Sequence, residues 1–154
     1  MHKMQVNVDS QRGIYQQAIR YLSYREYAVE ELRLKLQNKF GESSYIEQIL
    51  CQLLEDDLLS EQRYAESYIR ARVSKGCGPE RIQNELLQKR IERTIIERAF
   101  AELEVAWEQE IHKVWLKKFG NNKAESAQEK AKQWRFLQYR GFLNEQIRML
   151  LGSL

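Results

Sequence analysis

The sequence predicts an all-α protein in which three tandem three-helix repeats form an elongated, curved array. One proline in 154 residues, and glycines that fall almost only where periodic segments end, favour many short helices over strands. Apolar residues in those segments recur every three or four positions, as they do on one face of a helix. Similar segments return after about fifty residues, and units this small are expected to stack on one another to bury their cores.

The first repeat is predicted to span residues 14–57, after a polar, aperiodic tail over residues 1–13 that is expected to be flexible. Gly41 can close its second helix as a left-handed cap, and Ser43 or Ser44 can cap its third helix. The residues expected to face its core are Tyr15, Ala18, Ile19, Leu22, Leu32, Leu36, Phe40, Ile46, Ile49, Leu50, Leu53 and Leu54.

The second repeat is predicted to span residues 58–103. Its first helix is expected to end at Lys75-Gly76, and Pro79 can open the next helix, where its missing N–H costs no hydrogen bond. Thr94 can cap the last helix. The residues expected to face this core are Tyr64, Ala65, Tyr68, Ile69, Val73, Ile82, Leu86, Leu87, Ile95, Ile96, Ala99, Phe100 and Leu103.

A shift of the chain by fifty positions aligns these two repeats, with apolar residues on apolar residues and Ser44 on Thr94. The identical pairs are Leu36/Leu86, Lys39/Lys89, Glu42/Glu92, Ile46/Ile96, Glu47/Glu97 and Leu53/Leu103. Chance would supply about one or two identities over such a stretch, but not a matched core stripe as well. The internal repeat is therefore real.

The third repeat is predicted to span residues 104–154, and it aligns with the second after a shift of 51 positions. The positions that then coincide are Leu137 with Leu86, Arg140 with Lys89, and Ile147 with Ile96. The residues expected to face its core are Trp107, Ile111, Val114, Trp115, Ala127, Ala131, Trp134, Leu137, Ile147, Leu150 and Leu151.

Positive charge is concentrated in the last third of the chain. Residues 111–154 carry nine Lys or Arg against three acids, a net +6, so the total of +3 leaves −3 for residues 1–110. Such asymmetry suggests a nucleic acid or an acidic protein as partner. A solvated basic face with no partner is the alternative.

The sequence contains no set of residues typical of catalysis. It lacks the phosphate-binding loop, the dinucleotide fingerprint and the HExxH zinc motif. His2 and His112 are far apart, and Asp56-Asp57 reads as a solvated turn. Cys51 is expected in the core and Cys77 in an accessible loop, with neither a disulfide nor a metal site. We therefore expect a non-enzymatic protein without a cofactor, soluble and cytoplasmic, with no membrane-spanning segment and monomeric.

Binding features are better represented, because basic side chains recur along the second and third repeats. Candidates for contact with a phosphate backbone or an acidic partner are Arg70, Arg72, Lys75, Arg81, Lys89, Arg90, Lys117, Lys118, Lys130, Lys132, Arg135 and Arg140. Those of the second repeat can instead pair with acids one helical turn away, as in Arg81–Glu85–Lys89. Phe136 and Tyr139 are core residues or, alternatively, base-stacking platforms. Charge reversal at Lys117, Lys118, Lys130 and Lys132 is predicted to weaken binding without unfolding the protein.

Two stretches of this sequence carry distinctive motifs. Residues 58–91 read LLSEQRYAESYIRARVSKGCGPERIQNELLQKRI, and residues 135–147 read RFLQYRGFLNEQI. They resemble the central and the C-terminal signatures of the RecX family of bacterial RecA regulators. Residues 21–40 match more loosely. The sequence departs from the family pattern at Glu61, where aspartate is usual, at Ala28, where a serine cap is common, and at Asp57, where glycine is frequent.

The resemblance implies three tandem three-helix repeats and a partner, the RecA filament on single-stranded DNA. It further implies inhibition of strand exchange, ATP hydrolysis and co-protease activity in DNA repair and the SOS response. Sequence-nonspecific contact with single- or double-stranded DNA is compatible with the basic charge. An independent nucleic-acid-binding protein and a helical scaffold for another partner are the alternatives; no helix carries the base-reading residues of a repressor followed by a dimerisation element.

Overall fold

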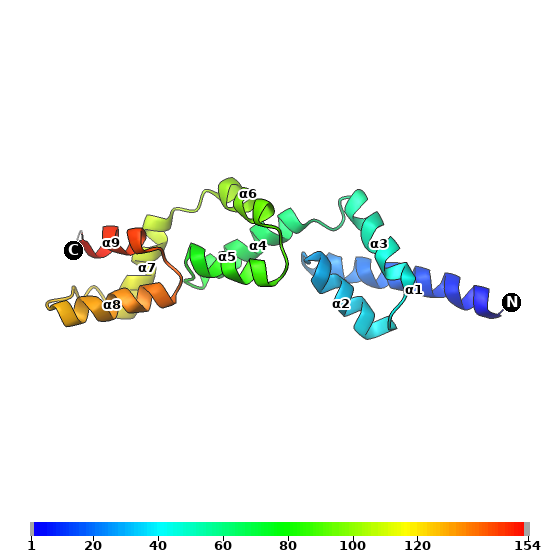
Figure 1. Cartoon of the computed structure of the whole chain (residues 1–154), viewed down its shortest axis with the longest axis horizontal. Coiled ribbons are helices and arrows are strands. Elements are labelled where there is room, and N and C mark those ends of the chain that lie inside the picture. Colours follow the sequence, from blue (N-terminus) through cyan, green and yellow to red (C-terminus); the bar gives the residue numbers. More distant parts are fainter. Residues whose placement is uncertain (1, 153–154) are drawn as a thin grey trace.

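The computed structural model describes residues 2–152, with side chains from Ser10 onward. The helices of this part of the chain are α1 (His2–Tyr24), α2 (Val29–Phe40), α3 (Ser44–Glu55), α4 (Glu61–Ser74), α5 (Pro79–Gln88), α6 (Arg93–Leu103), α7 (Trp107–Phe119), α8 (Ala127–Tyr139) and α9 (Asn144–Gly152). They form three groups of three that follow one another along the long axis, with the termini at opposite ends (Figure 1). The prediction of an elongated array of helical repeats is confirmed.

The first helix differs from its prediction, because α1 begins at His2 and not near residue 14. Residues 2–13, which the sequence predicts as an aperiodic tail, are therefore helical, and residue 1 lies outside the described residues. Ile14 and Ala18 are buried and fix the C-terminal half of this helix against the first core. Extension beyond an existing helical turn costs far less than starting one, and the segment holds no proline. A polar helix can therefore extend out from the packed half without an apolar stripe of its own.

Each group of helices encloses its own core, and most of the predicted inward residues lie in these cores. The first core includes Leu32, Leu36, Ile46 and Leu53, all at most 1 % exposed. The second and third cores are built by the same pattern. The fully buried residues at their centres are Ile69, Ile82, Leu86, Ala99, Trp115, Leu137 and Ile147.

Several single-residue predictions are wrong. Leu54 is 43 % exposed, because the stripe of α3 ends at Leu53. On α8, Ala127 and Ala131 are exposed, while Gln133 is buried. Gln133 accepts a hydrogen bond from the Trp115 indole N–H (3.0 Å) and donates one to a backbone carbonyl, so its amide is satisfied inside the core.

The two cysteines exchange their expected environments. Cys51 is exposed because it points away from the buried stripe of α3. Cys77 is buried in the second core, and its backbone N–H donates to the Arg72 carbonyl oxygen (3.0 Å). The loop that holds Cys77 between two glycines packs against the third repeat. The prediction of an accessible Cys77, which rested on these glycines, is therefore wrong.

Helix caps follow the sequence in part. Ser43 caps α3 by accepting the N–H of Tyr45, and Ser60 caps α4 by accepting the N–H of Arg63. Thr94 does not cap α6, since that helix already begins at Arg93 with Glu92 as N-cap. Ala28 occupies the N-cap position of α2, where it cannot accept a hydrogen bond.

Replacing Ala28 by serine is expected to raise the free energy of unfolding by about 1 kcal/mol, the usual worth of an N-cap hydroxyl. The backbone of Ala28 is already extended (φ −73°, ψ 152°), as an N-cap requires. Urea denaturation followed by circular dichroism measures the change. Because Ala28 is only 1 % exposed, an Ala28→Val variant serves as the contrast: it adds bulk without an acceptor and should destabilise.

The second and third repeats are joined by a backbone contact between two glycines. The N–H of Gly78 donates to the carbonyl of Arg140 (2.8 Å), and the N–H of Glu80 donates to the carbonyl of Gly141 (3.0 Å). A Cβ added to Gly78 would lie 2.4 Å from backbone atoms of Gly141 and Phe142. This approach fixes the third repeat against the loop between α4 and α5.

The first and second repeats are joined mainly through side chains. Ala28, at the start of α2, is buried in the second core rather than the first. The Arg63 Nε atom donates to the Glu26 carboxylate (3.1 Å) across this junction, and Arg90 lies 4.0 Å from Glu30. Both junctions therefore position neighbouring repeats by specific contacts.

Candidate nucleic-acid interface

A groove lined by cationic side chains lies between the second and third repeats, where the C-terminal end of α4 meets α7 and the end of α8. Its floor is apolar (Val73, Val114 and Phe136), and its volume is about 340 Å³. A depression with Arg70, Leu103 and Val105 adjoins it through shared residues. The cations that line the two are Arg70, Lys75, Lys113, Lys117, Lys118 and Arg140, here called the basic groove.

Local sequence explains why these cations converge. Lys113 and Lys117 are four residues apart on α7, so they share one face of that helix, and Lys118 follows in the last turn. Cations near the C-terminus of a helix are stabilised by its dipole. Gly76, at φ 86°, ends the turn after α4 and brings that turn against Val114. The loop therefore carries Lys75 to the cationic face of α7.

Arg140 connects the two walls of the groove. Its Nη1 atom donates to the backbone carbonyl of Lys75 (3.2 Å). Its guanidinium carbon lies 5.4 Å from the centre of the Phe136 ring, and the Lys118 ammonium lies at the same distance from that ring. Attraction to the ring face offsets part of the repulsion between the two cations.

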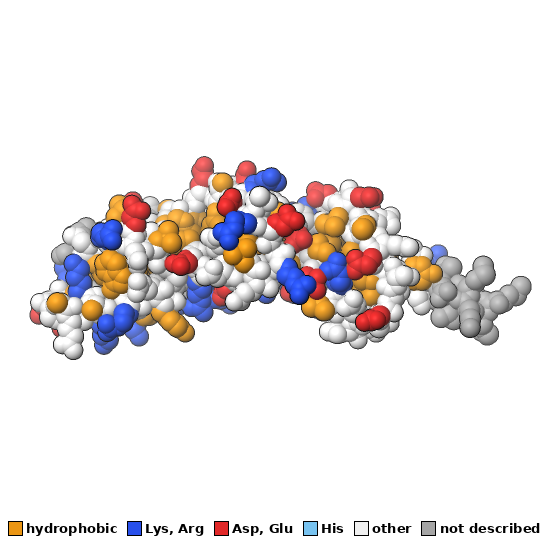
Figure 2. Space-filling model, in the orientation of Figure 1, with side chains coloured by type: hydrophobic (Ala, Val, Ile, Leu, Met, Phe, Trp, Pro, Cys, Tyr) orange, Lys and Arg blue, Asp and Glu red, His pale blue; other side chains and the backbone are white. Residues whose placement is uncertain are grey.

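Most charges of the basic groove have no acid opposite them. Within residues 10–152, Lys113 pairs with Glu110 (3.2 Å), whereas Arg70, Lys75, Lys117, Lys118 and Arg140 form no ion pair. In Figure 2, Lys and Arg side chains line the lower edge of the third repeat and of its junction with the second. Unpaired cations on rigid helices are suited to bind phosphate groups.

The structure places five of the twelve predicted residues in the basic groove: Arg70, Lys75, Lys117, Lys118 and Arg140. Lys130, Lys132 and Arg135 are exposed on α8 outside it. Lys132 instead lines a separate depression with Lys123 and Asn122. Glu125 and Glu129 line that depression too, so its charge is balanced and it is not a second cationic region.

Other predicted residues are held by contacts within the second repeat or with the first. Arg81 lies 3.6 Å from Glu85, the intrahelical pair considered above, whereas the Lys89 ammonium lies over the Tyr68 ring at 5.5 Å. Arg90 pairs loosely with Glu30 of the first repeat. These side chains are less free to bind phosphate than those of the basic groove.

Arg72 has a structural partner. It binds both carboxylate oxygens of Glu85 at 2.9 Å, and the Tyr68 hydroxyl donates to the same carboxylate. Burial raises the pKa of Glu85, but these hydrogen bonds outweigh burial and leave the pKa below its usual value. Burial and the bond to Glu85 raise the pKa of Tyr68 to about 12.

Arg72→Ala is expected to lower the free energy of unfolding by about 1–3 kcal/mol at neutral pH, because Glu85 loses its bidentate partner while staying half-buried. The depressed pKa of Glu85 means that this stability is present above the ordinary carboxyl pKa and is lost as pH falls through the lowered value. Denaturation of both proteins across acid pH should therefore show a shrinking difference. The exposed Arg70, changed to alanine, is the control and should leave stability within about 0.5 kcal/mol of the wild type.

The candidate set predicted from the sequence omitted Lys113, although its spacing from Lys117 was visible. The signal that could have included it is the same helical spacing, read together with the turn at Lys75 that lies opposite. The turn at Lys75 faces α7 only because the second and third repeats pack together. Periodicity within one repeat does not describe that packing.

Three-helix units in tandem, with a groove lined by cations at one junction, define a helical repeat protein. Among residues 2–152, no helix is long and apolar enough to cross a bilayer. In that same part of the chain, no three His, Cys, Asp or Glu side chains come together as a metal site would require.

Comparison with known proteins identifies the family. Residues 60–99 match the second three-helix domain of RecX, and residues 108–151 match its third. The chain is 40% identical over 150 residues to regulatory protein RecX of Pseudomonas putida (strain GB-1), covering 97% of this chain and 96% of the relative. It is 39% identical to regulatory protein RecX of Pseudomonas fluorescens (strain SBW25), covering 97% of each. The chain belongs to the RecX family.

Solved structures agree with the fold. The crystal structure of RecX from Lactobacillus salivarius superposes with a TM-score of 0.77 at 24% identity, covering 96% of this chain and 97% of that one. A second RecX crystal structure gives 0.76 at 21% identity, covering 97% and 74%. The predicted family and fold class are confirmed, and the relatives are regulatory proteins, as expected of a chain that binds rather than catalyses.

Proposed function

We propose that this protein regulates RecA by binding along the RecA filament on single-stranded DNA, and that it mostly inhibits the recombinase, ATPase and co-protease activities of that filament. Membership of a family of regulatory proteins supports the regulatory role. The observation that supports the mode of binding is the basic groove: four cations without an acidic partner among the described residues surround its apolar floor, and Arg70 lines the adjoining depression. An elongated chain can lie along an extended partner and contact several of its subunits.

The basic groove fits the phosphate backbone of the DNA in the filament or an acidic surface of the recombinase. Phosphate contact of this kind is independent of base sequence, so sequence-nonspecific affinity is expected. We expect the protein to act in the cytoplasm as a monomer. The three repeats are proposed to divide at residues 14–57, 58–103 and 104–154.

The direct test is the rate of ATP hydrolysis by RecA on single-stranded DNA, measured with increasing amounts of this protein. We expect hydrolysis to fall as the protein approaches stoichiometry with RecA subunits. Unchanged hydrolysis and filament lifetime at stoichiometric protein would reject the proposal.

The same titration separates the alternative, an independent nucleic-acid-binding protein. That protein would inhibit only by competing for free DNA, so adding it to preformed filaments would have no effect while excess single-stranded DNA would reverse inhibition. A filament regulator inhibits preformed filaments, and excess single-stranded DNA does not reverse that inhibition.

A further inference from the structure

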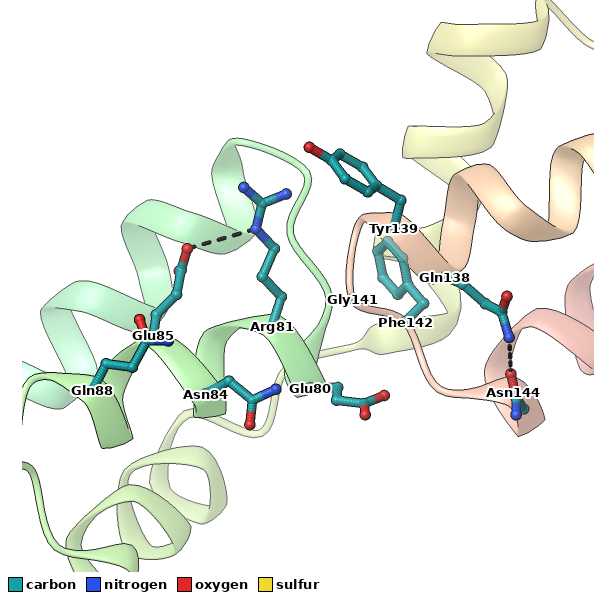
Figure 3. A pocket seen from close by; sticks show the side chains of 10 residues that line it. All are labelled: Glu80, Arg81, Asn84, Glu85, Gln88, Gln138, Tyr139, Gly141, Phe142 and Asn144. Atoms are coloured by element: carbon teal, nitrogen blue, oxygen red, sulfur yellow. Dashed lines mark hydrogen bonds and ion pairs between the residues drawn. The ribbon is translucent and has the colours of Figure 1, made fainter.

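A second recess at the junction of the second and third repeats differs from the basic groove. It lies between α5 and the turn from α8 to α9, and its volume is about 640 Å³, within the range of small-molecule sites. Its lining is rich in side-chain amides and holds one exposed aromatic ring (Figure 3). The side chains that the argument uses are Arg81, Asn84, Gln138, Tyr139 and Asn144.

Tyr139 is the exposed ring. It is 77 % exposed, so its ring is open to solvent. The Arg81 guanidinium carbon lies 5.6 Å from the ring centre, and Figure 3 shows Arg81 and Tyr139 pointing toward one another from opposite sides of the recess. A planar cation beside an open aromatic face is a platform on which a flat, uncharged ring system can stack.

The sequence left open whether Phe136 or Tyr139 could stack on a base, and the surroundings of the two rings decide between them. Phe136 packs edge-on against Phe119 with ring centres 5.5 Å apart, and Lys118 and Arg140 approach the Phe136 ring. It is part of the floor of the basic groove. Of the two rings, Tyr139 alone is freely accessible.

Charge excludes a phosphate as the occupant of this recess. Glu80 and Glu85 line it beside Arg81, and Arg81 is already paired with Glu85 at 3.6 Å. Amides remain for the polar edge of a ligand: Gln138 donates to the Asn144 side-chain oxygen (2.8 Å), which leaves the Gln138 oxygen and the Asn144 N–H groups directed to other partners. An uncharged ring with donors and acceptors on its edge fits this lining.

The recess and the basic groove are adjacent through the chain itself. Tyr139 and Arg140 are consecutive at the end of α8; Tyr139 lines the recess and Arg140 lines the groove. We propose that the recess binds one unpaired nucleobase of a single-stranded nucleic acid, stacked on Tyr139 beside Arg81, while the neighbouring phosphates lie in the basic groove. This goes beyond the proposed function, since it concerns bare strands and needs no recombinase.

The test is the affinity of the full chain for a fluorescein-labelled oligothymidine, measured by fluorescence anisotropy. Tyr139→Ala is expected to weaken binding about tenfold or more, in the range known for loss of one stacked base, whereas Tyr139→Phe keeps it. Tyr24, 81 % exposed at the end of α1, supplies the matched control, and Tyr24→Ala should bind as the wild type does. Circular dichroism confirms that each variant is folded.

Two further measurements separate stacking from other effects. An abasic strand of the same length keeps the phosphates but not the bases, so wild type and Tyr139→Ala should bind it equally. A strand with 5-bromodeoxyuridine should crosslink under ultraviolet light to the peptide that contains Tyr139. Equal affinity of Tyr139→Ala and Tyr24→Ala for oligothymidine, or equal losses on the normal and abasic strands, would overturn the base site. Inhibition of RecA by the Tyr139→Ala protein would show that the proposed function stands even then.

Discussion

Replacing Gly78 by alanine is expected to lower the free energy of unfolding by about 1–3 kcal/mol and to loosen the junction between the second and third repeats. The backbone of Gly78 (φ −86°, ψ 170°) suits alanine, so conformational strain contributes nothing. The effect comes from space alone, because the new Cβ would lie 2.4 Å from the backbone of Gly141 and Phe142. Separation of these segments also breaks the bonds from the Gly78 and Glu80 N–H groups.

Urea denaturation followed by circular dichroism measures the loss, and small-angle scattering measures the loosening as an increase in maximum dimension. Gly152→Ala is the control, since a Cβ there meets nothing within 4 Å and the residue ends α9. Because Lys75 and Arg140 stand on opposite sides of this junction, the Gly78→Ala protein should also bind single-stranded DNA more weakly. A variant as stable and as compact as the wild type would contradict the close packing of the two repeats.

Reversal of charge at Lys117 and Lys118 is expected to weaken binding to single-stranded DNA at least tenfold at low salt, without loss of helicity. Both side chains are exposed in the basic groove and form no ion pair within residues 10–152, so the folded state depends little on them. Loss of two phosphate contacts should also reduce the slope of log affinity against log salt by about 1.4. Fluorescence anisotropy across a salt series measures both quantities.

Lys130→Glu combined with Lys132→Glu is the matched variant, with the same change of charge on α8. The sequence predicts an effect for all four lysines, but the structure separates the two pairs, because neither Lys130 nor Lys132 lines the basic groove. The α8 pair should therefore have the smaller effect. Equal effects of the two double variants would mean that net charge, and not the groove, determines affinity.

The repeat architecture could be predicted because each unit carries its own apolar spacing. Leu36 and Leu86, aligned by the fifty-residue shift, are both fully buried at equivalent places in successive cores. What this spacing could not reveal is burial that depends on a polar partner. Gln133 lies in the third core because Trp115 offers it an indole N–H, while the apolar Ala127 and Ala131 remain outside. The helix over residues 2–13 also could not be predicted from apolar spacing, because it continues from the packed half of α1 and has no apolar stripe of its own.

The binding surface was predictable as a set of residues but not as a place. Basic side chains were correctly seen to gather toward the C-terminal third, yet the sequence treated Arg72 and Arg70 alike. Glu85, thirteen residues beyond Arg72, binds Arg72 within the second repeat, whereas Arg70 has no such partner within residues 10–152 and lines the groove. The groove lies at the junction that is held by the contact of Gly78 with Gly141, between segments more than sixty residues apart in the chain. No pattern within one repeat predicts such a contact.

Lysine reactivity provides the most direct test of the claim that this protein binds through the groove between its second and third repeats. The chain is acetylated at limiting reagent, alone and bound to RecA filaments on single-stranded DNA, and each lysine is quantified by mass spectrometry. We expect Lys75, Lys117 and Lys118 to lose reactivity on the filament, and the exposed Lys39 of the first repeat to change little. Protection of Lys39 with undiminished reactivity of Lys117 and Lys118 would contradict the assignment of the basic groove.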